Sequence, residues 1–464
     1  AFGGVASGAS AGVMFTNPAL LGTVKPYISV EHLAYFPHLD IKLMDRPAGS
    51  DIPYSYYDAT FPVSGQDTVD KPLPTAELNR ARSDTSLRQG HQNIIVSLVQ
   101  KTGIRGLSAG LLLKMPTPDP GSLSLKYFDE REQFFSNQLH FARFGEWDDL
   151  MLVSFGGAYD LTKELAIGVS LKSTTVMTAN TFSYIPEATV QQHGLSDAEM
   201  KMNVKFRPVI GLAYRPNDWI RLGLAGRAET YLASKVTANI QMWNYHYPST
   251  GKESDDITTP KRVTQSHTMV SLFQPYELSL GLGLDLDTFF AETNLTYSLW
   301  SRFLTMHNDS PEDSATGGVE QGDDDFAFSD TLTCNVTTGI RTDYNMEFVF
   351  SGNWQQSPVP AQIGRSNFVD GDLVGLSMGA FLVREVLSKN IKFGVSMQVW
   401  RMMDSEVYKD PTYIIDEFPD DAMTIKDGLT MSESAGLQTN NPGFPGYTSG
   451  GWLYSTGISL GVEL

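Results

Sequence analysis

Apolar and polar residues alternate in short segments along almost the whole chain. In the last segment, residues 452–464, Tyr454, Ile458 and Leu460 share one face, while small and polar residues occupy the other. A period of two residues is typical of β-strands, and its repetition is the sequence signature of a transmembrane β-barrel. The pattern predicts further strands at 27–36 (closed by Pro37), 94–99, 107–115, 151–159, 165–171, 206–214, 219–231, 278–284, 289–303, 331–341, 346–354, 373–383 and 391–402.

The connections between these segments alternate between short and long. Bacterial outer-membrane barrels have short periplasmic turns and long extracellular loops, whereas soluble β-sandwiches rarely show this regularity. We therefore predict an all-β fold, a transmembrane antiparallel β-barrel of about 14 strands, with the short turns at one end. Those turns are expected at 101–105, 160–163, 216–218, 285–288, 342–345 and 388–390, and long polar stretches such as 37–89 and 116–147 separate the hairpins.

The first 22 residues differ from the rest of the chain. They are rich in Gly, Ala and Ser and have no regular period, yet they include Phe15, Leu20 and Leu21. Such a segment is either a mobile tail or a plug whose apolar side chains the barrel encloses. We favour a plug, because its backbone can bond inward-facing polar residues, such as Arg227 and Glu229, that need partners of their own. The chain then divides into an N-terminal plug (hatch), residues 1–25, and a barrel with long extracellular loops, residues 26–464.

The overall composition argues against several other classes of protein. The 464 residues carry a formal net charge of -19, which disfavours a nucleic-acid partner. No apolar run is long enough for a transmembrane helix, and the single cysteine, Cys334, allows no intramolecular disulfide. The eight histidines lack metal-ligand spacing, and no nucleophile and base stand together. We therefore expect no enzymatic activity, no cofactor and no metal.

Several charged residues occupy positions that the alternation directs inward. In the segment 219–231, Ile220 faces lipid, so Arg227 and Glu229 face the lumen, and Lys172 faces it as well. Buried charges need partners. These side chains either bond one another and the plug backbone, or one cation, Arg227 or Lys172, meets a substrate carboxylate. By the same alternation the inward set also includes Glu292, Arg302, Glu347 and Gln398.

The predicted extracellular loops contain apolar side chains, and such clusters often mark surfaces for ligands or partners. We predict that they bind a hydrophobic substrate. Packing of the loops into a cap, and contacts with protein partners, remain alternatives. The residues concerned are Phe182, Tyr184 and Ile185 after one strand, Trp243, Tyr245 and Tyr247 in the loop 241–265, and the stretch PTYIIDEF at 411–418.

Four motifs occur in order along the chain. They are Asn17-Pro18-Ala19 in the plug, YSLWSRF at 297–303, the loop Ser357-Pro358-Val359-Pro360-Ala361-Gln362, and GWLY at 451–454. With these motifs the sequence resembles the FadL-type family, the outer-membrane channels for long-chain fatty acids and other hydrophobic compounds. The loop motif is the most specific of the four, and together they extend over nearly the whole chain.

The resemblance implies a fourteen-stranded barrel in the outer membrane of a Gram-negative bacterium, surrounded by membrane lipids and lipopolysaccharide. It implies passive uptake of hydrophobic small molecules such as long-chain fatty acids, with a hatch in the lumen and a lateral opening near a kinked strand. The rival interpretation is a barrel that transports nothing and anchors a surface, secretion or motility assembly. Large apolar loops suit either role.

Overall fold

A computed structural model gives the architecture of the chain. It describes residues 4–8, 10–48, 50, 82–117, 139–143, 151–184, 195–242, 261–303, 307–308, 327–414, 436–437, 439 and 441–464.

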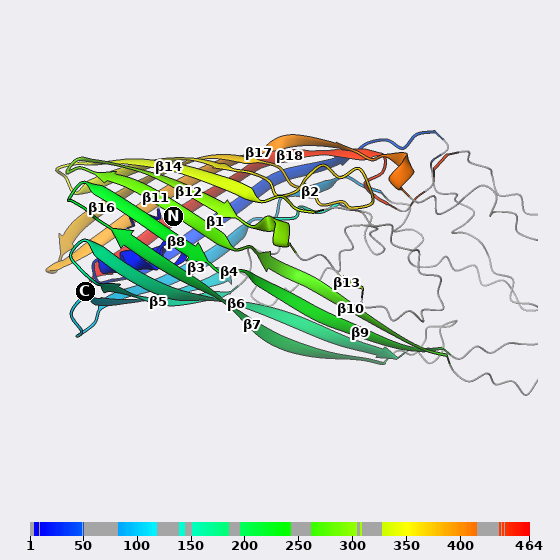
Figure 1. The fold of residues 1–464 in the computed structure, drawn as a ribbon, viewed down its shortest axis with the longest axis horizontal. Helices are drawn as coiled ribbons and strands as arrows, with labels where there is room; N and C mark the ends of the chain where they lie inside the picture. Colours follow the sequence, from blue (N-terminus) through cyan, green and yellow to red (C-terminus); the bar gives the residue numbers. More distant parts are fainter. Residues whose placement is uncertain are drawn as a thin grey trace, which may run out of the picture.

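The strands form one large antiparallel sheet that closes on itself (Figure 1). Fifteen strands belong to it, and fourteen of them build the wall, because β2 (Thr85–Leu87) only adds to β1. The first and last wall strands pair from Tyr27↔Glu463 to Leu43↔Tyr447. Closure leaves no sheet edge in the bilayer. The wall strands are β1 (Tyr27–Leu43), β3 (His91–Lys101), β4 (Leu107–Thr117), β5 (Leu152–Asp160), β6 (Leu165–Tyr184), β7 (Leu195–Tyr214), β8 (Ile220–Arg227), β11 (Glu277–Asp285), β12 (Phe289–Ser298), β14 (Thr331–Arg341), β15 (Met346–Gln355), β16 (Leu373–Val386), β17 (Lys389–Tyr408) and β18 (Gly446–Glu463).

The two faces of the wall differ as the alternation predicted. On β11, Leu278, Leu280 and Leu282 are more than half exposed on the outer face, whereas Ser279 is fully buried on the inner face. Such an apolar outer face suits lipid, where the closed ladder pairs most of the backbone groups of the wall. The predicted transmembrane barrel of fourteen strands is therefore confirmed. Among the described residues, no helix is long and apolar enough to cross a membrane.

The short turns all lie at one end of the barrel, which we call the turn end; the opposite end is the loop end. Antiparallel pairing puts the β3–β4, β5–β6, β7–β8, β11–β12, β14–β15 and β16–β17 connections together at the turn end. This confirms the prediction that the short turns share one end of the barrel. The last of them is shifted: Leu387 and Ser388 make it, with φ of 52° and 62°, and Lys389 already begins β17.

Pro37 does not end the first strand, contrary to prediction. Strand β1 continues through it to Leu43. On one side of β1 the ladder to β3 ends at Tyr35, and the ladder to β2 begins at Leu39. Pro37 lies between these ladders, so on that side no neighbour requires the N–H that proline lacks.

Two other predicted strands end early. The segment 219–231 divides at Ala228 and Glu229 into β8 and a strand of a second sheet, β9 (Thr230–Met242). The segment 289–303 leaves the wall at Ser298 and forms a 3-10 turn, η3 (Trp300–Arg302). In both places apolar or small residues still occupy the outward phase beyond the last wall residue, Ala228 after β8 and Leu299 after β12, so the outward phase alone does not locate the end.

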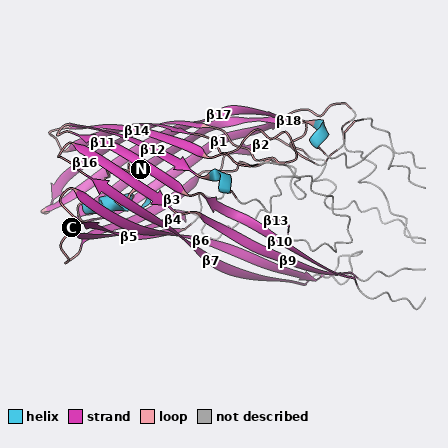
Figure 2. Ribbon diagram, viewed as in Figure 1, coloured by secondary structure: helices cyan, strands magenta, loops and turns pink. Residues whose placement is uncertain are grey.

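The second sheet contains β9, β10 (Lys261–Gln274) and β13 (His307–Asn308), and it extends past the wall at the loop end (Figure 1). Four short helical segments complete the secondary structure of the described residues (Figure 2). Besides η3, they are α1 (Val13–Thr16), η1 (Pro18–Gly22) and η4 (Pro411–Tyr413).

Apolar side chains gather inside the barrel in two clusters. The cluster at the turn end joins α1 and η1, through Met14, Leu20 and Leu21, to inward residues such as Leu112 and Ala213. The cluster at the loop end joins inward residues of β1 and β16–β18 to two connecting segments. These segments meet at a bridge between Phe141 and Val369.

Candidate functional site

The N-terminal segment lies against the inner face of the wall. Asn17 caps η1 by accepting a hydrogen bond from the Ala19 N–H, and its Nδ2 donates to the carbonyl oxygens of Val5 and Leu212. Pro18 and Ala19 are buried as well, and the Ser170 hydroxyl of β6 donates to the Met14 carbonyl. One asparagine thus joins two parts of the segment to β7.

Glycines in the wall make this close approach possible. A Cβ atom added at Gly168 of β6 would overlap the backbone of Pro18 and Ala19, and one at Gly211 of β7 would overlap the Asn17 side chain. Asn17-Pro18-Ala19 therefore rests on the bare backbone of two wall strands, where any larger residue would displace it.

Strand β12 holds the beginning of the segment. The Asn294 Oδ1 accepts from the Val5 N–H at 2.8 Å, and the Glu292 carboxylate accepts from the Ala6 N–H at 2.9 Å and from the Ser7 hydroxyl. Glu292 is 3% exposed. As predicted, this carboxylate points inward, and it satisfies backbone donors that the irregular segment cannot pair internally.

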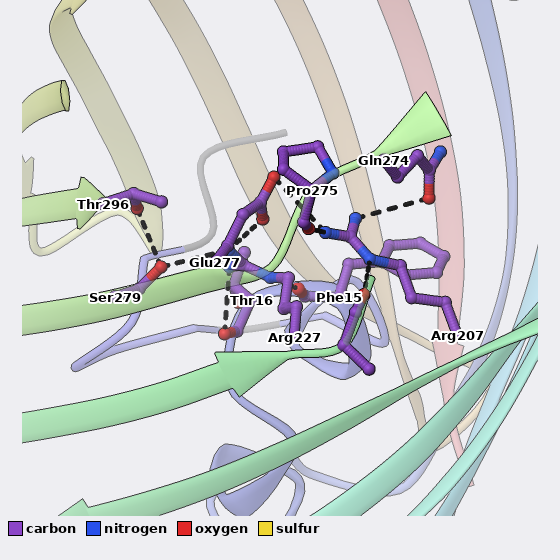
Figure 3. A network of polar contacts seen from close by, with 10 residues as sticks. Phe15, Thr16, Arg207, Arg227, Gln274, Pro275, Glu277, Ser279 and Thr296 are labelled. Atoms are coloured by element: carbon purple, nitrogen blue, oxygen red, sulfur yellow. Dashed lines mark hydrogen bonds and ion pairs between the residues drawn. The ribbon is translucent and has the colours of Figure 1, made fainter. Parts of the chain in front are cut away.

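Four charged side chains lie next to the segment, and Figure 3 shows three of them, Arg207, Arg227 and Glu277. We call Lys172, Arg207, Arg227 and Glu277 the charge cluster. Arg227 donates from Nε to the Phe15 carbonyl at 2.6 Å and from NH2 to the Thr16 carbonyl at 3.2 Å. Its NH1 meets Glu277 at 2.7 Å. A wall cation therefore anchors the N-terminal backbone directly.

Arg207 and Lys172 add positive charge to the same place. Arg207 donates to the Pro275 carbonyl at 2.6 Å and lies 3.5 Å from Glu277. The Lys172 Nζ lies 5.9 Å from the centroid of the Phe15 ring. Within the cluster one carboxylate faces three cations, so an anionic group of a ligand would be favoured here.

The sequence predicted only part of this cluster. Lys172 and Arg227 were predicted to face inward, and the structure brings them together with Arg207 and Glu277, which were not singled out. Among the described residues, Glu229 does not bond the N-terminal segment and instead forms an ion pair with Arg302 at 2.8 Å, beyond the end of β8. Arg302 itself lies in η3 and is half exposed, so the predicted inward position is wrong.

Five aromatic side chains meet at the loop end, next to the charge cluster along β10. We call them the aromatic cluster. Phe303 and Phe328 stack with ring centroids 4.1 Å apart, and Phe368 meets both rings edge-on, at 5.8 and 5.1 Å. Phe273 and Trp300 complete the group, and Gln274, which follows Phe273, accepts a hydrogen bond from Arg207. Trp300 and Phe303 belong to the second of the four motifs.

The loop motif organises the neighbouring segment. Ser357 donates from its N–H to Asp372 at 2.7 Å and from its hydroxyl to Asp370 at 2.8 Å. The Ser357 hydroxyl also accepts from the Val359 N–H, and the Pro358 carbonyl accepts from the Ser329 N–H. Pro360 is partly buried, Ala361 is exposed, and Gln362 is buried against the backbone of Phe368.

The wall is interrupted beside the charge cluster. The ladder between β7 and β8 covers only Val209–Tyr214 of β7, and among the described residues no ladder joins β7 to β9. A pocket of about 490 Å³ lies at the interruption. Its lining is apolar and includes the outward residues Ile210 and Leu278, and the inward residues Arg227 and Glu277 border it. The pocket therefore lies on the outer side of the wall, next to the charge cluster.

The predicted loop residues fall largely outside the described part of the chain. Phe182 and Tyr184 belong to β6, whose ladder pairs them with Asp197 and Leu195. They are therefore strand residues, and the predicted loop assignment is wrong for them because β6 is long. Ile185, Trp243, Tyr245 and Tyr247 lie outside the described residues.

Comparisons with known proteins identify the fold. No protein-family model matches the sequence, and no curated protein shows significant sequence similarity to it. The structure is similar to the crystal structure of a FadL homologue from Pseudomonas aeruginosa, with a TM-score of 0.53 and 13% identity over 99% of this chain and 94% of that chain. The toluene transporters TbuX of Ralstonia pickettii and TodX of P. putida give TM-scores of 0.46 and 0.47, with 12% and 10% identity over 100% of this chain and 98% of each of theirs. The chain therefore has the FadL-type fold.

Proposed function

We propose that the protein is an outer-membrane channel for the passive uptake of hydrophobic small molecules, long-chain fatty acids among them. The FadL-type fold supports this reading, and so does the outer face of the barrel, which suits membrane lipids and, in the outer leaflet, lipopolysaccharide. The observation that carries the proposal is the charge cluster with its excess of positive charge beside the aromatic cluster. An amphiphile with an apolar tail and an anionic head matches the two together.

In this proposal the aromatic cluster binds the apolar tail of the ligand, and the charge cluster binds its anionic head. Trp300 and Phe303, the partly exposed rings of the aromatic cluster, offer the tail an apolar surface of low conformational entropy. The buried rings of Phe273, Phe328 and Phe368 hold them in place.

Lys172 and Arg227 bind the carboxylate, because charge-assisted hydrogen bonds are about twice as strong as neutral ones. The same Arg227 holds the Phe15 and Thr16 carbonyls, so a carboxylate competes with the N-terminal segment for its donors. Binding thereby loosens the segment, which acts as the hatch of the lumen.

The wall pocket is the exit that we assign to this path. It adjoins Arg227 on the inside and Ile210 on the lipid side, so a molecule released from the charge cluster reaches lipid without crossing the hatch. Pro208 lines the pocket and has no N–H to contribute to a ladder, which keeps the wall interrupted there.

A pair of probes tests the proposed role of Lys172. The purified protein is titrated with 1-pyrenedodecanoic acid and with its methyl ester, and binding is followed by energy transfer from tryptophan to pyrene. We expect Lys172→Met to weaken binding of the acid roughly tenfold, as for the loss of one hydrogen bond to a charged group, and to leave binding of the ester unchanged. Equal binding of the acid by the variant and the parent would remove Lys172 from the site.

A further inference from the structure

A buried glutamine in the loop motif holds the residue that completes the aromatic cluster. The Gln362 Oε1 accepts a hydrogen bond from the Phe368 N–H at 2.7 Å, and the Gln362 Nε2 donates to the Phe368 carbonyl. Gln362 is 3% exposed. Both ends of one side-chain amide thus bond both polar groups of one residue. The Tyr447 hydroxyl donates to the same carbonyl at 3.4 Å, and together these contacts fix the position and the orientation of that part of the backbone.

Phe368 lies where the two apolar regions of the loop end meet. Its ring contacts Phe303 and Phe328 in the aromatic cluster. The next residue, Val369, belongs to the apolar cluster at the loop end and pairs with Phe141. A shift of this backbone therefore moves the ring relative to its aromatic neighbours.

We propose that Gln362 is a positioning residue for ligand binding: it acts through the Phe368 backbone to hold the buried Phe368 ring against Phe303, one of the two partly exposed rings that receive the apolar part of the ligand. The inference rests on the proposed function. Without Gln362 the Phe368 N–H loses its buried acceptor, which is costly. The backbone then turns toward new partners, and the ring leaves the edge-on arrangement that aromatic pairs prefer.

The aromatic cluster contains no charged side chain, so the positioning effect is independent of the ligand's head group. Gln362 and Lys172 therefore have distinguishable effects on the two probes described above. A change at Gln362 acts on the acid and on the ester alike, whereas a change at Lys172 acts on the acid alone.

The test compares Gln362→Leu, which removes both hydrogen bonds, with Gln362→Glu, which has the same size and keeps the acceptor. Ile363→Ala is the matched control, because the Ile363 side chain is 50% exposed in the same loop. We expect Gln362→Leu to raise the half-saturating concentration of both probes about tenfold. The number of binding sites per chain stays the same, Gln362→Glu gives a smaller shift, and the control gives none.

Two results overturn the inference while leaving the proposed function in place. One is unchanged half-saturation in Gln362→Leu while Lys172→Met still separates the acid from the ester. The other is fewer sites of unchanged affinity, which shows that Gln362 only supports folding. Should Gln362→Leu fail to fold, Gln362→Glu decides between the same outcomes. If the parent protein binds neither probe, the proposed function fails, and the inference fails with it.

Discussion

The Nε of Arg227 lies 2.6 Å from the Phe15 carbonyl oxygen, so a side chain of strand β8 holds the backbone of the N-terminal segment inside the barrel. Arg227→Met keeps much of the side-chain length and removes all its donors. Because hydrogen bonds from a charged donor contribute about 1.5–3 kcal/mol each, we expect the hatch to open more often. Planar-bilayer recordings should then show more frequent conducting events.

Arg302→Met is the control for that experiment. Arg302 is also a cation near the loop end, but its ion pair is with Glu229 and its side chain is 56% exposed. We expect it to conduct like the parent protein. If Arg227→Met shows no more conducting events than this control, Arg227 does not anchor the hatch.

The wall glycines give a second, steric test of the hatch. In Gly211→Val the new side chain occupies the place of the Asn17 amide, so the N-terminal segment cannot dock while the wall ladder is retained. We expect a heat-resistant barrel that leaks small ions. Gly352→Val is the matched control, because a Cβ at Gly352 meets nothing within 4 Å. Identical conductance in the two variants would contradict docking at Gly211.

The wall pocket can be closed with one substitution. Gly226 lines it, and a Cβ added there also meets nothing within 4 Å, so a side chain can start from this position, and the ring in Gly226→Trp is placed to fill the pocket. We expect uptake of a hydrophobic probe by whole cells to fall while ion conductance stays at the parent level. Gly352→Trp is the control. Unchanged uptake in Gly226→Trp would show that the ligand leaves by another route.

The aromatic residues between β9 and β10 lie outside the described part of the chain, and their role stays a prediction. We expect replacement of Trp243, Tyr245 and Tyr247 together by Ala to lower uptake of a hydrophobic probe while the barrel remains heat-resistant. Loop residues add little to the hydrogen-bonded closure of the wall. Parent-level uptake in a whole-cell assay would remove these three residues from the capture surface.

Much of the wall was predictable because each strand has one face toward lipid and one toward the lumen. Apolar and polar residues therefore alternate along the sequence of each strand. The same signal failed where strands end. Trp300, in η3, breaks the period, because it follows Leu299 and falls on the phase of the inward polar residues of β12. One such break is not enough to mark the end of a strand in the sequence, since Phe303 returns to the outward phase. The prediction that Pro37 ends the first strand was wrong because the sequence does not show that its missing N–H falls between two ladders.

The site was less predictable than the wall. Alternation showed that Arg227 and Lys172 face inward, but it could not show that Arg207 and Glu277 meet them, because that contact depends on strand register and on the interruption after β8. A local signal was present at both residues: Arg207 precedes Pro208, and Glu277 follows Pro275 by two residues. A proline within one strand and another just before a second strand indicate an interrupted ladder.

Uptake of a long-chain fatty acid by living cells tests the central claim most directly. The chain is expressed in Gram-negative cells whose own long-chain fatty-acid channel has been deleted, and entry of radiolabelled oleate is measured against an empty vector and against the Lys172→Met variant. We expect uptake well above the empty vector, with an intermediate rate for Lys172→Met. Uptake no greater than that of the empty vector, with the folded barrel demonstrated in the outer membrane, would contradict the proposed transport of fatty acids.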